Sequence, residues 1–134
     1  MMKPLLALLL LLWHIPTKNA FQADVIDDLS MQLKSGNAKE IAKNFAASVE
    51  LIIIDQEDVY SKAQSEQILK DFFLKYPPNK IAIVHRLNNN QNFKLGIFSL
   101  GTKNGKFRVT VTLNLRKPSN AFLITELRIE QERE

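Results

Sequence analysis

The order of apolar and polar positions predicts helices in the first half of the chain and strands in the second. From Phe21 to Lys34 apolar residues recur at helical spacing, and acidic residues stand at the start, where the helix dipole favours anions. Gly36 can cap this helix, and Asn37 with Glu40 three residues later predicts the capping box of a second one. The apolar face expected for the second helix is Ala38, Ile41, Ala42 and Phe45.

A strand and a long helix are predicted next. The β-branched run 49–54 indicates a largely buried strand. Ser61 with Gln64 forms another capping box, and the helix that it begins must end at Pro77 and Pro78, because proline cannot continue a helix. The wide apolar stripe of this helix comprises Ile68, Leu69, Phe72, Phe73 and Tyr76.

After Pro78 apolar and polar residues alternate, which predicts four strands joined as an antiparallel meander. Asn104-Gly105 predicts a tight primed hairpin turn, and the polar segments 88–92 and 118–120 supply the other two turns. Helices followed by a meander predict an α+β domain, with N-terminal helices packed on one face of a curved antiparallel sheet. The residues expected to face inward are Ile81, Ile83, His85, Leu87; Phe93, Leu95, Ile97; Phe107, Val109, Val111, Leu113, Leu115; and Leu123, Thr125, Leu127, Ile129.

The first twenty residues predict a destination. Lys3 precedes the Leu-rich run 5–13 and a polar stretch follows it, which is the pattern of a secretory signal peptide. The run is shorter than the roughly 20 residues of a spanning helix, and an uncleaved anchor is the alternative. We expect removal of residues 1–20, with the cleavage position left open by Lys18, and a single domain over 21–134. The mature protein is then periplasmic or secreted, with no membrane span.

Composition excludes several classes of function. The chain of 134 residues is 46% hydrophobic and 24% charged, which is ordinary for one globular domain. Without cysteine it has no disulfide, no Cys-ligated metal, no thiol nucleophile and no lipidated N-terminal cysteine. Removal of Lys3 and Lys18 takes the 18 basic residues to 16 against 14 acidic ones, and this net charge of +2 argues against nucleic-acid binding. No cofactor is expected, since phosphate loops and nucleophile elbows are absent from the sequence.

Three stretches of sequence carry a family resemblance. They are Tyr60-Ser61-Lys62-Ala63-Gln64 continuing through Gln67-Ile68-Leu69-Lys70-Asp71-Phe72-Phe73, then Asn104-Gly105-Lys106-Phe107-Arg108-Val109, and Leu127-Arg128-Ile129-Glu130. With the predicted order of elements, the chain resembles the nuclear transport factor two-like cone fold, also called cystatin-like. More narrowly it resembles a family of short exported bacterial proteins of unknown function. The resemblance implies a fold and a destination, and it carries no activity.

Enzymatic members of this superfamily provide a test of catalytic residues. Ketosteroid isomerases carry a tyrosine on the first helix and an aspartate base on the first strand. The matching positions here are Leu29, seven residues before Gly36, and Leu51, directly after Val49-Glu50. Because proton abstraction next to a carbonyl needs a base and an oxyanion donor, the resemblance does not extend to that chemistry, and no catalytic residue is assigned.

Candidate ligand-binding residues inside the cone are His85, Tyr60 and Phe73. His85 is the only histidine after the leader, and its parity with Ile81 and Ile83 predicts an inward side chain that could shuttle protons. A core or rim histidine bonded to a backbone carbonyl is the favoured alternative. Tyr60 is expected to pack against the long helix, and metal binding is not expected, because a site needs three or four clustered ligands.

Acidic residues precede Tyr60 in a predicted polar loop. Asp55, Glu57 and Asp58 could overhang the mouth of the cone as acid or base groups, or as a weak cation site, although the spacing of a calcium loop is absent. A solvated polar loop is the favoured interpretation.

The outer face of the meander is a candidate interface. Alternation places Arg108, Thr110, Thr112, Asn114 and Arg116 on one side of their strand, with Arg86, Glu126, Arg128 and Glu130 expected beside them. This face could bind an acidic partner or a second copy, and a solvated face with cross-strand charge pairs is the commoner arrangement. Phe122 and Ile124, expected on the same side, favour a protein contact. The interface candidates are therefore Arg108, Thr112, Phe122, Ile124 and Arg128.

Two hypotheses of function remain from the sequence. The favoured one is a non-enzymatic exported module that binds through its outer sheet face or its cone, as a homodimer, to another envelope protein or to a small apolar ligand. The alternative is a small isomerase, lyase or hydrolase, which requires His85 to meet a carboxylate such as Glu50 or Asp55 inside a cavity. Since voids are costly in a small domain, we expect Phe72 and Phe107 to fill the cone, which favours the outer face.

Overall fold

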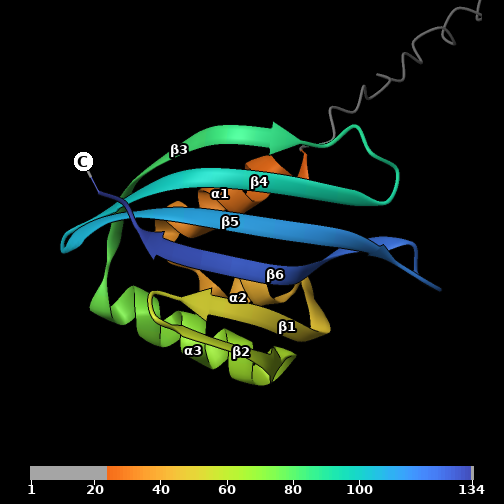
Figure 1. The fold of residues 1–134 in the computed structure, drawn as a ribbon, viewed down its shortest axis with the longest axis horizontal. Helices are drawn as coiled ribbons and strands as arrows, with labels where there is room; N and C mark the ends of the chain where they lie inside the picture. The colour runs from red at the N-terminus through yellow and green to blue at the C-terminus, as the bar shows by residue number, and fades with distance from the viewer. Residues whose placement is uncertain (1–23, 134) are drawn as a thin grey trace, which may run out of the picture.

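The computed structural model describes residues 24–133, and the predicted leader lies outside them. The elements are α1 (Val25–Ser35), α2 (Ala38–Ala42), β1 (Phe45–Ile53), β2 (Gln56–Ser61), α3 (Lys62–Lys75), β3 (Pro78–Leu87), β4 (Phe93–Thr102), β5 (Gly105–Arg116) and β6 (Ala121–Gln131). One six-stranded sheet has the order β2-β1-β6-β5-β4-β3. β1 runs parallel to β6 and all other neighbours are antiparallel. Figure 1 shows the helices behind this sheet, so the expected α+β architecture and four-strand meander are confirmed.

The helix ends follow the capping signals of the sequence. Gly36 adopts φ 63°, and its N–H donates to the last carbonyls of α1. The Asn37 side chain accepts from the Glu40 N–H at 3.1 Å to begin α2. Ser61 and Gln64 make both bonds of the capping box at 3.1 Å, which fixes the start of α3. None of the helices in the described part of the chain is long and apolar enough to cross a membrane.

Three local expectations are wrong. The second helix ends at Ala42, and Phe45 begins β1 instead of belonging to a helical face. The acidic segment after Ile54 is not a loop: it forms β2, which pairs with β1 along a tight hairpin. The Lys103-Asn104 turn between β4 and β5 is not of the primed type, because the positive φ falls on Gly105 (131°) instead of on the two turn residues.

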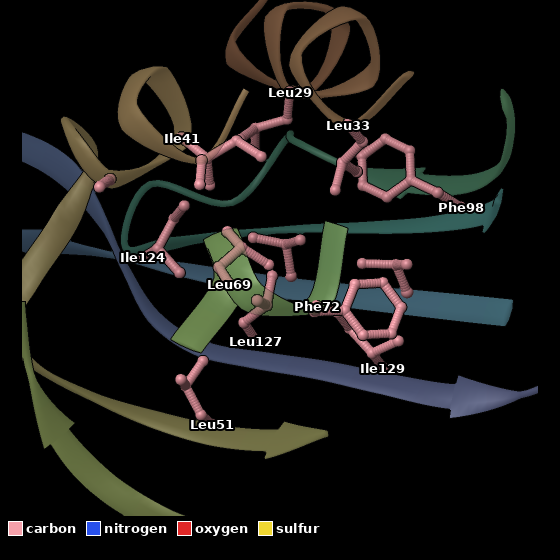
Figure 2. Close-up of a cluster of buried hydrophobic side chains, with 14 of the residues drawn as sticks. Leu29, Leu33, Ile41, Leu51, Leu69, Phe72, Phe98, Ile124, Leu127 and Ile129 are labelled. Carbon is pink, nitrogen blue, oxygen red and sulfur yellow. The ribbon is translucent and has the colours of Figure 1, made fainter. Parts of the chain in front are cut away.

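The interior of the cone is filled by side chains from all three helices and the sheet. Figure 2 shows Leu69 and Phe72 of α3 beside the sheet residues Leu127 and Ile129, and Leu29 of α1 belongs to the same core. The ring of Phe107 lies edge-on to Phe72 and Tyr76, at centroid distances of 5.2 and 4.8 Å. The expected interdigitation of α3 with β5 is therefore present, and the cone is a packed core rather than a pocket.

Two β-bulges decide which side chains face this core. In β3, Ile83 pairs with Phe98 and His85 with Ile97, so Val84 is the extra residue. In β6 the registers Leu113–Ile124 and Thr112–Glu126 leave Thr125 as the extra residue. Because side chains alternate along a strand, one inserted residue exchanges the two faces beyond it.

Candidate functional site

The outer face of the sheet, defined as the side without helices, carries three of the predicted interface residues. Arg108, Thr112 and Arg128 lie on it, on the neighbouring strands β5 and β6. Phe122 and Ile124 do not, because the bulge in β6 turns them to the inner side. Ile124 is fully buried in the core, and Phe122 packs half-buried against the core.

Two guanidinium groups of the outer face, those of Arg108 and Arg128, are paired with carboxylates of the same face. Arg128 lies 3.5 Å from both Glu126 and Glu130, on either side of it along β6. Arg108 lies 3.8 Å from Glu132. Such exposed pairs contribute little stability, but they cancel charge locally, which disfavours an acidic partner on this part of the face. The arrangement is the solvated, charge-paired face that the sequence favoured.

A second feature of the outer face is an acidic cluster of Glu50, Glu57 and Glu126 on β1, β2 and β6. A hydrogen bond with Glu57 raises the pKa of Glu50, with further contributions from burial and from the charges of Glu126 and Glu57, while Arg128 acts in the opposite sense. Within residues 24–133, no three His, Asp or Glu side chains are arranged to hold a metal ion.

The third feature is an apolar strip on β3 and β4, which sequence reasoning placed on the inner side. Leu87 pairs with Leu95, and His85 with Ile97, all on the outer face. We define the apolar strip as Leu87, Leu95 and Ile97, which are half-buried, together with the exposed Val84 at the bulge. The signal that could have found it is Gly96.

Gly96 faces the core between Leu95 and Ile97. A Cβ atom at this position would stand 2.9 Å from the Phe98 ring and 3.1 Å from Ile26 of α1, so only glycine fits. A glycine inside an apolar strand run indicates such a close approach. Gly96 therefore lies on the inner side of β4 together with Phe98, and the alternation of side chains places Leu95 and Ile97 on the outer side.

His85 does not lie inside the cone. The bulge at Val84 turns its side chain to the outer face, where it is exposed. The sheet places β4, β5 and β6 between β3 and β1, so His85 is four strands from Glu50, roughly 19 Å at about 4.8 Å per strand. Asp55 lies still beyond, in the turn after β1. The convergence that the enzyme hypothesis requires is therefore not formed.

The other predicted ligand-binding residues belong to the core. Phe73 is buried among the cluster that fills the cone, and Tyr60 of β2 packs half-buried against it. Neither lines a cavity.

Arg86, expected on the outer face, is instead an inner clasp between β3 and α1. Its guanidinium donates to Asp24 at 2.9 Å and to Asp27 at 2.7 Å, and Asn88 donates to Asp24 at 2.6 Å. The hydrogen bond from Arg86 lowers the pKa of Asp27. Because Asp24 is also the N-cap of α1, this clasp holds the start of the helix against the edge of the sheet.

One of several shallow hollows at the surface has isoleucine and aromatic side chains on its floor. It has a volume of about 360 Å³ and lies between α3 and the turn that joins β1 to β2. Its rim carries Asp55, Asp71 and Lys75. We call it the α3 groove, and its floor consists of Ile53, Ile54, Ile68, Phe72 and Tyr76. Three further hollows that are similarly open, of about 320 to 400 Å³, lie elsewhere on the surface.

Comparison with known proteins gives the family. The model of the domain of unknown function DUF4783 matches residues 26–130, so the chain belongs to this family. A DUF4783 protein from Bacteroides uniformis is 25% identical and has a TM-score of 0.77, over 83% of this chain and 100% of that one. A comparison with curated proteins finds no match.

More distant structures share the fold alone. A domain of unknown function with a cystatin-like fold from Nostoc punctiforme has a TM-score of 0.63 at 8% identity, over 82% of this chain and 75% of that one. A nuclear transport factor two-like protein of unknown function from Silicibacter pomeroyi has a TM-score of 0.58 at 11% identity, over 81% and 90%. The predicted cone fold is confirmed.

Proposed function

We propose that this DUF4783 protein is an exported, non-enzymatic interaction module that binds a second copy of itself through the apolar strip on its outer face. The observation that carries the proposal is the strip itself. Leu87, Leu95 and Ile97 lie on two neighbouring strands of a face that no helix covers. Contiguous apolar side chains that remain in contact with water are typical of protein interfaces.

A second copy fits the distribution of charge on this face. A two-fold axis running between β3 and β4 would lay the strip of one copy on the strip of the other, as symmetric dimers require. The acidic cluster begins on β6, two strands from β4, or roughly 10 Å at about 4.8 Å per strand. Its carboxylates would then stay at the border of the contact, in water, where their mutual repulsion costs little.

The filled cone supports the same choice. Phe107 and Phe72 occupy the space in which a small apolar ligand or a substrate would have to bind. Export is supported by Lys3 and the short apolar run 5–13. Protein recovered from the extracytoplasmic fraction should have an intact mass that starts near Phe21, and a full-length chain fixed in the inner membrane would contradict export.

Sedimentation equilibrium tests the dimer. The wild type is expected to sediment as a dimer at micromolar concentration, and Ile97→Lys as a folded monomer, because a buried lysine in the strip would lack a partner. Met31→Lys is the matched control, since Met31 is an exposed apolar residue of α1, on the helical side of the molecule. It should remain dimeric. A monomeric wild type, or a dimer that Ile97→Lys leaves intact, would overturn the proposal. Ile124→Lys is unsuitable, because Ile124 belongs to the core.

A further inference from the structure

The α3 groove has an apolar floor that its own fold does not cover. Ile53, Ile68 and Tyr76 are only half-buried, although they lie next to the fully packed core. The floor combines side chains from the end of β1 with one face of α3. The groove therefore offers aliphatic and aromatic contact to a molecule that enters from solvent.

The backbone conformation of Ile54 indicates that an isoleucine side chain is needed at this position of the groove. Ile54 has φ 58°, a left-handed conformation that is strained for a β-branched residue and costs about 1–2 kcal/mol. A tight turn would ordinarily use glycine or asparagine here. The Ile54 N–H donates to the Ile129 carbonyl at 2.8 Å, which holds the residue in position, and its side chain lines the groove. Strain that persists in this way points to a function at the site.

The rim of the groove determines the charge of the molecule that fits. Two carboxylates, Asp55 and Asp71, face one ammonium, Lys75, which stands 5.9 Å from the centre of the Tyr76 ring. In the described part of the chain, no basic side chain forms an ion pair with either carboxylate. Asp71 accepts one hydrogen bond from the Gln67 side chain at 3.0 Å, and both Asp55 and Asp71 are exposed. The rim therefore has a net charge of −1, which favours a cationic head group above an apolar floor.

We propose that the α3 groove binds a small free alkylammonium ion, an unbranched aliphatic chain that ends in a protonated primary amine. The chain would lie on Ile53, Ile54 and Ile68, and the ammonium would donate hydrogen bonds to Asp55 and Asp71. The floor offers five apolar side chains, more contact than the four-carbon stem of a peptide lysine would use, and this favours a free amine. The site is separate from the apolar strip, and it does not depend on dimerisation.

Matched probes test this assignment on the full mature chain. The isoleucine methyl resonances of the protein are followed by NMR during titration with n-hexylamine, with hexanoate, and with a blocked lysine amide. Hexylamine should shift the methyl signals of Ile53, Ile54 and Ile68, hexanoate should shift them at least about three-fold less at equal concentration, and the blocked lysine should bind more weakly than hexylamine. Equal responses to hexylamine and hexanoate would overturn the charge assignment, and tighter binding of the blocked lysine would overturn the assignment to a free amine.

Single substitutions distinguish amine binding in the α3 groove from nonspecific attraction of the amine to surface carboxylates. Asp71→Asn is expected to weaken hexylamine binding about three-fold, and Asp28→Asn, which removes an exposed carboxylate of α1, should leave it unchanged. Ile54→Asn keeps a residue that tolerates the left-handed backbone but removes the apolar contact, so it should fold and lose most of the binding. Unchanged binding in Asp71→Asn and in Ile54→Asn would place the amine elsewhere and refute the site.

Discussion

The filled cone is the premise on which the outer-face proposal depends, and Phe107→Ala tests it directly. Phe107 is completely buried, and its ring makes two edge-on contacts, with Phe72 and Tyr76. Truncation of a buried phenylalanine costs about 3–5 kcal/mol through lost burial and the cavity left behind. Each aromatic pair adds about 0.5–1.5 kcal/mol. We therefore expect a loss near the upper end, about 4–5 kcal/mol.

Urea unfolding measures this loss. With a slope of about 1.5 kcal/mol per molar urea, a loss of about 4–5 kcal/mol lowers the midpoint by roughly 3 M at unchanged slope. Because total stability is only about 5–15 kcal/mol, the variant stands close to unfolding. Phe107→Leu keeps most of the apolar volume and should lose only about 1–2 kcal/mol of unfolding free energy. It therefore provides a second measurement on a variant that stays folded.

The matched control is Phe122→Ala. Phe122 packs against the rim of the core, is only half-buried, and has the ammonium of Lys94 4.7 Å from its ring centre. Its truncation should cost clearly less than that of Phe107. If Phe107→Ala costs no more than Phe122→Ala, the ring is not enclosed by close packing, the cone contains accessible space, and a ligand inside it would again become the better hypothesis.

Four further variants test two charged groups, a buried hydroxyl and a helix cap. Arg86→Gln should flatten the loss of thermal stability on acidification through and below the ordinary pKa of aspartate, about 3.9. Its hydrogen bond lowers the pKa of Asp27, so the stabilisation is present above the unfolded pKa and lost as the pH falls through the folded one. An equally steep acid loss in the variant would contradict this. Glu50→Gln should stabilise the protein at neutral pH and lose that advantage in acid. The raised pKa of Glu50 means that stability falls as the pH rises from the unfolded to the folded value, and a destabilised variant at pH 7 would refute the reasoning. In thermal melts Ser65→Ala should be neutral or stabilising, because its buried hydroxyl has no hydrogen-bond partner. Ser61→Ala should cost about 0.5–2 kcal/mol, since it removes the cap of α3, and the opposite ranking of the two serines would disprove both assignments.

Elements of this fold could be predicted wherever a local signal fixes them. Gly36 and the pair Ser61 and Gln64 encode helix ends through hydrogen bonds within four residues, and the structure has those bonds. The meander could be predicted because its turns separate long alternating runs. The short strand β2 could not be predicted, because glutamate and aspartate are uncommon in strands. Glu57 and Asp58 are tolerated here because β2 is an exposed edge strand.

The candidate site was harder to predict than the fold, and the reason is the parity of the strands. Along β4 the run from Leu95 to Leu100 has apolar residues on both sides, so alternation alone does not say which side meets the helices. Gly96 shows which side meets the helices through its close approach to the Ile26 side chain of α1, and that contact is long-range in the sequence. In such a strand, the residues available for an interface can be identified only when the residues that pack against the helices on the opposite face are known.

The bulge in β3 also decides which side of the sheet two charged or titratable side chains face. At Val84 one inserted residue sends His85 to solvent and Arg86 to the carboxylates of α1, the reverse of the parity expected from Ile83. The exchange gives Asp27 and the N-cap carboxylate of Asp24 a guanidinium that donates to both of them, whereas without the bulge His85 would stand there opposite Gly96, and a neutral imidazole has only one N–H to donate. The same step turns the candidate histidine away from the cone and moves Leu87 to the outer face. The bulge therefore supplies Leu87 to the apolar strip, because an unbroken alternation along β3 would place this side chain on the inner side.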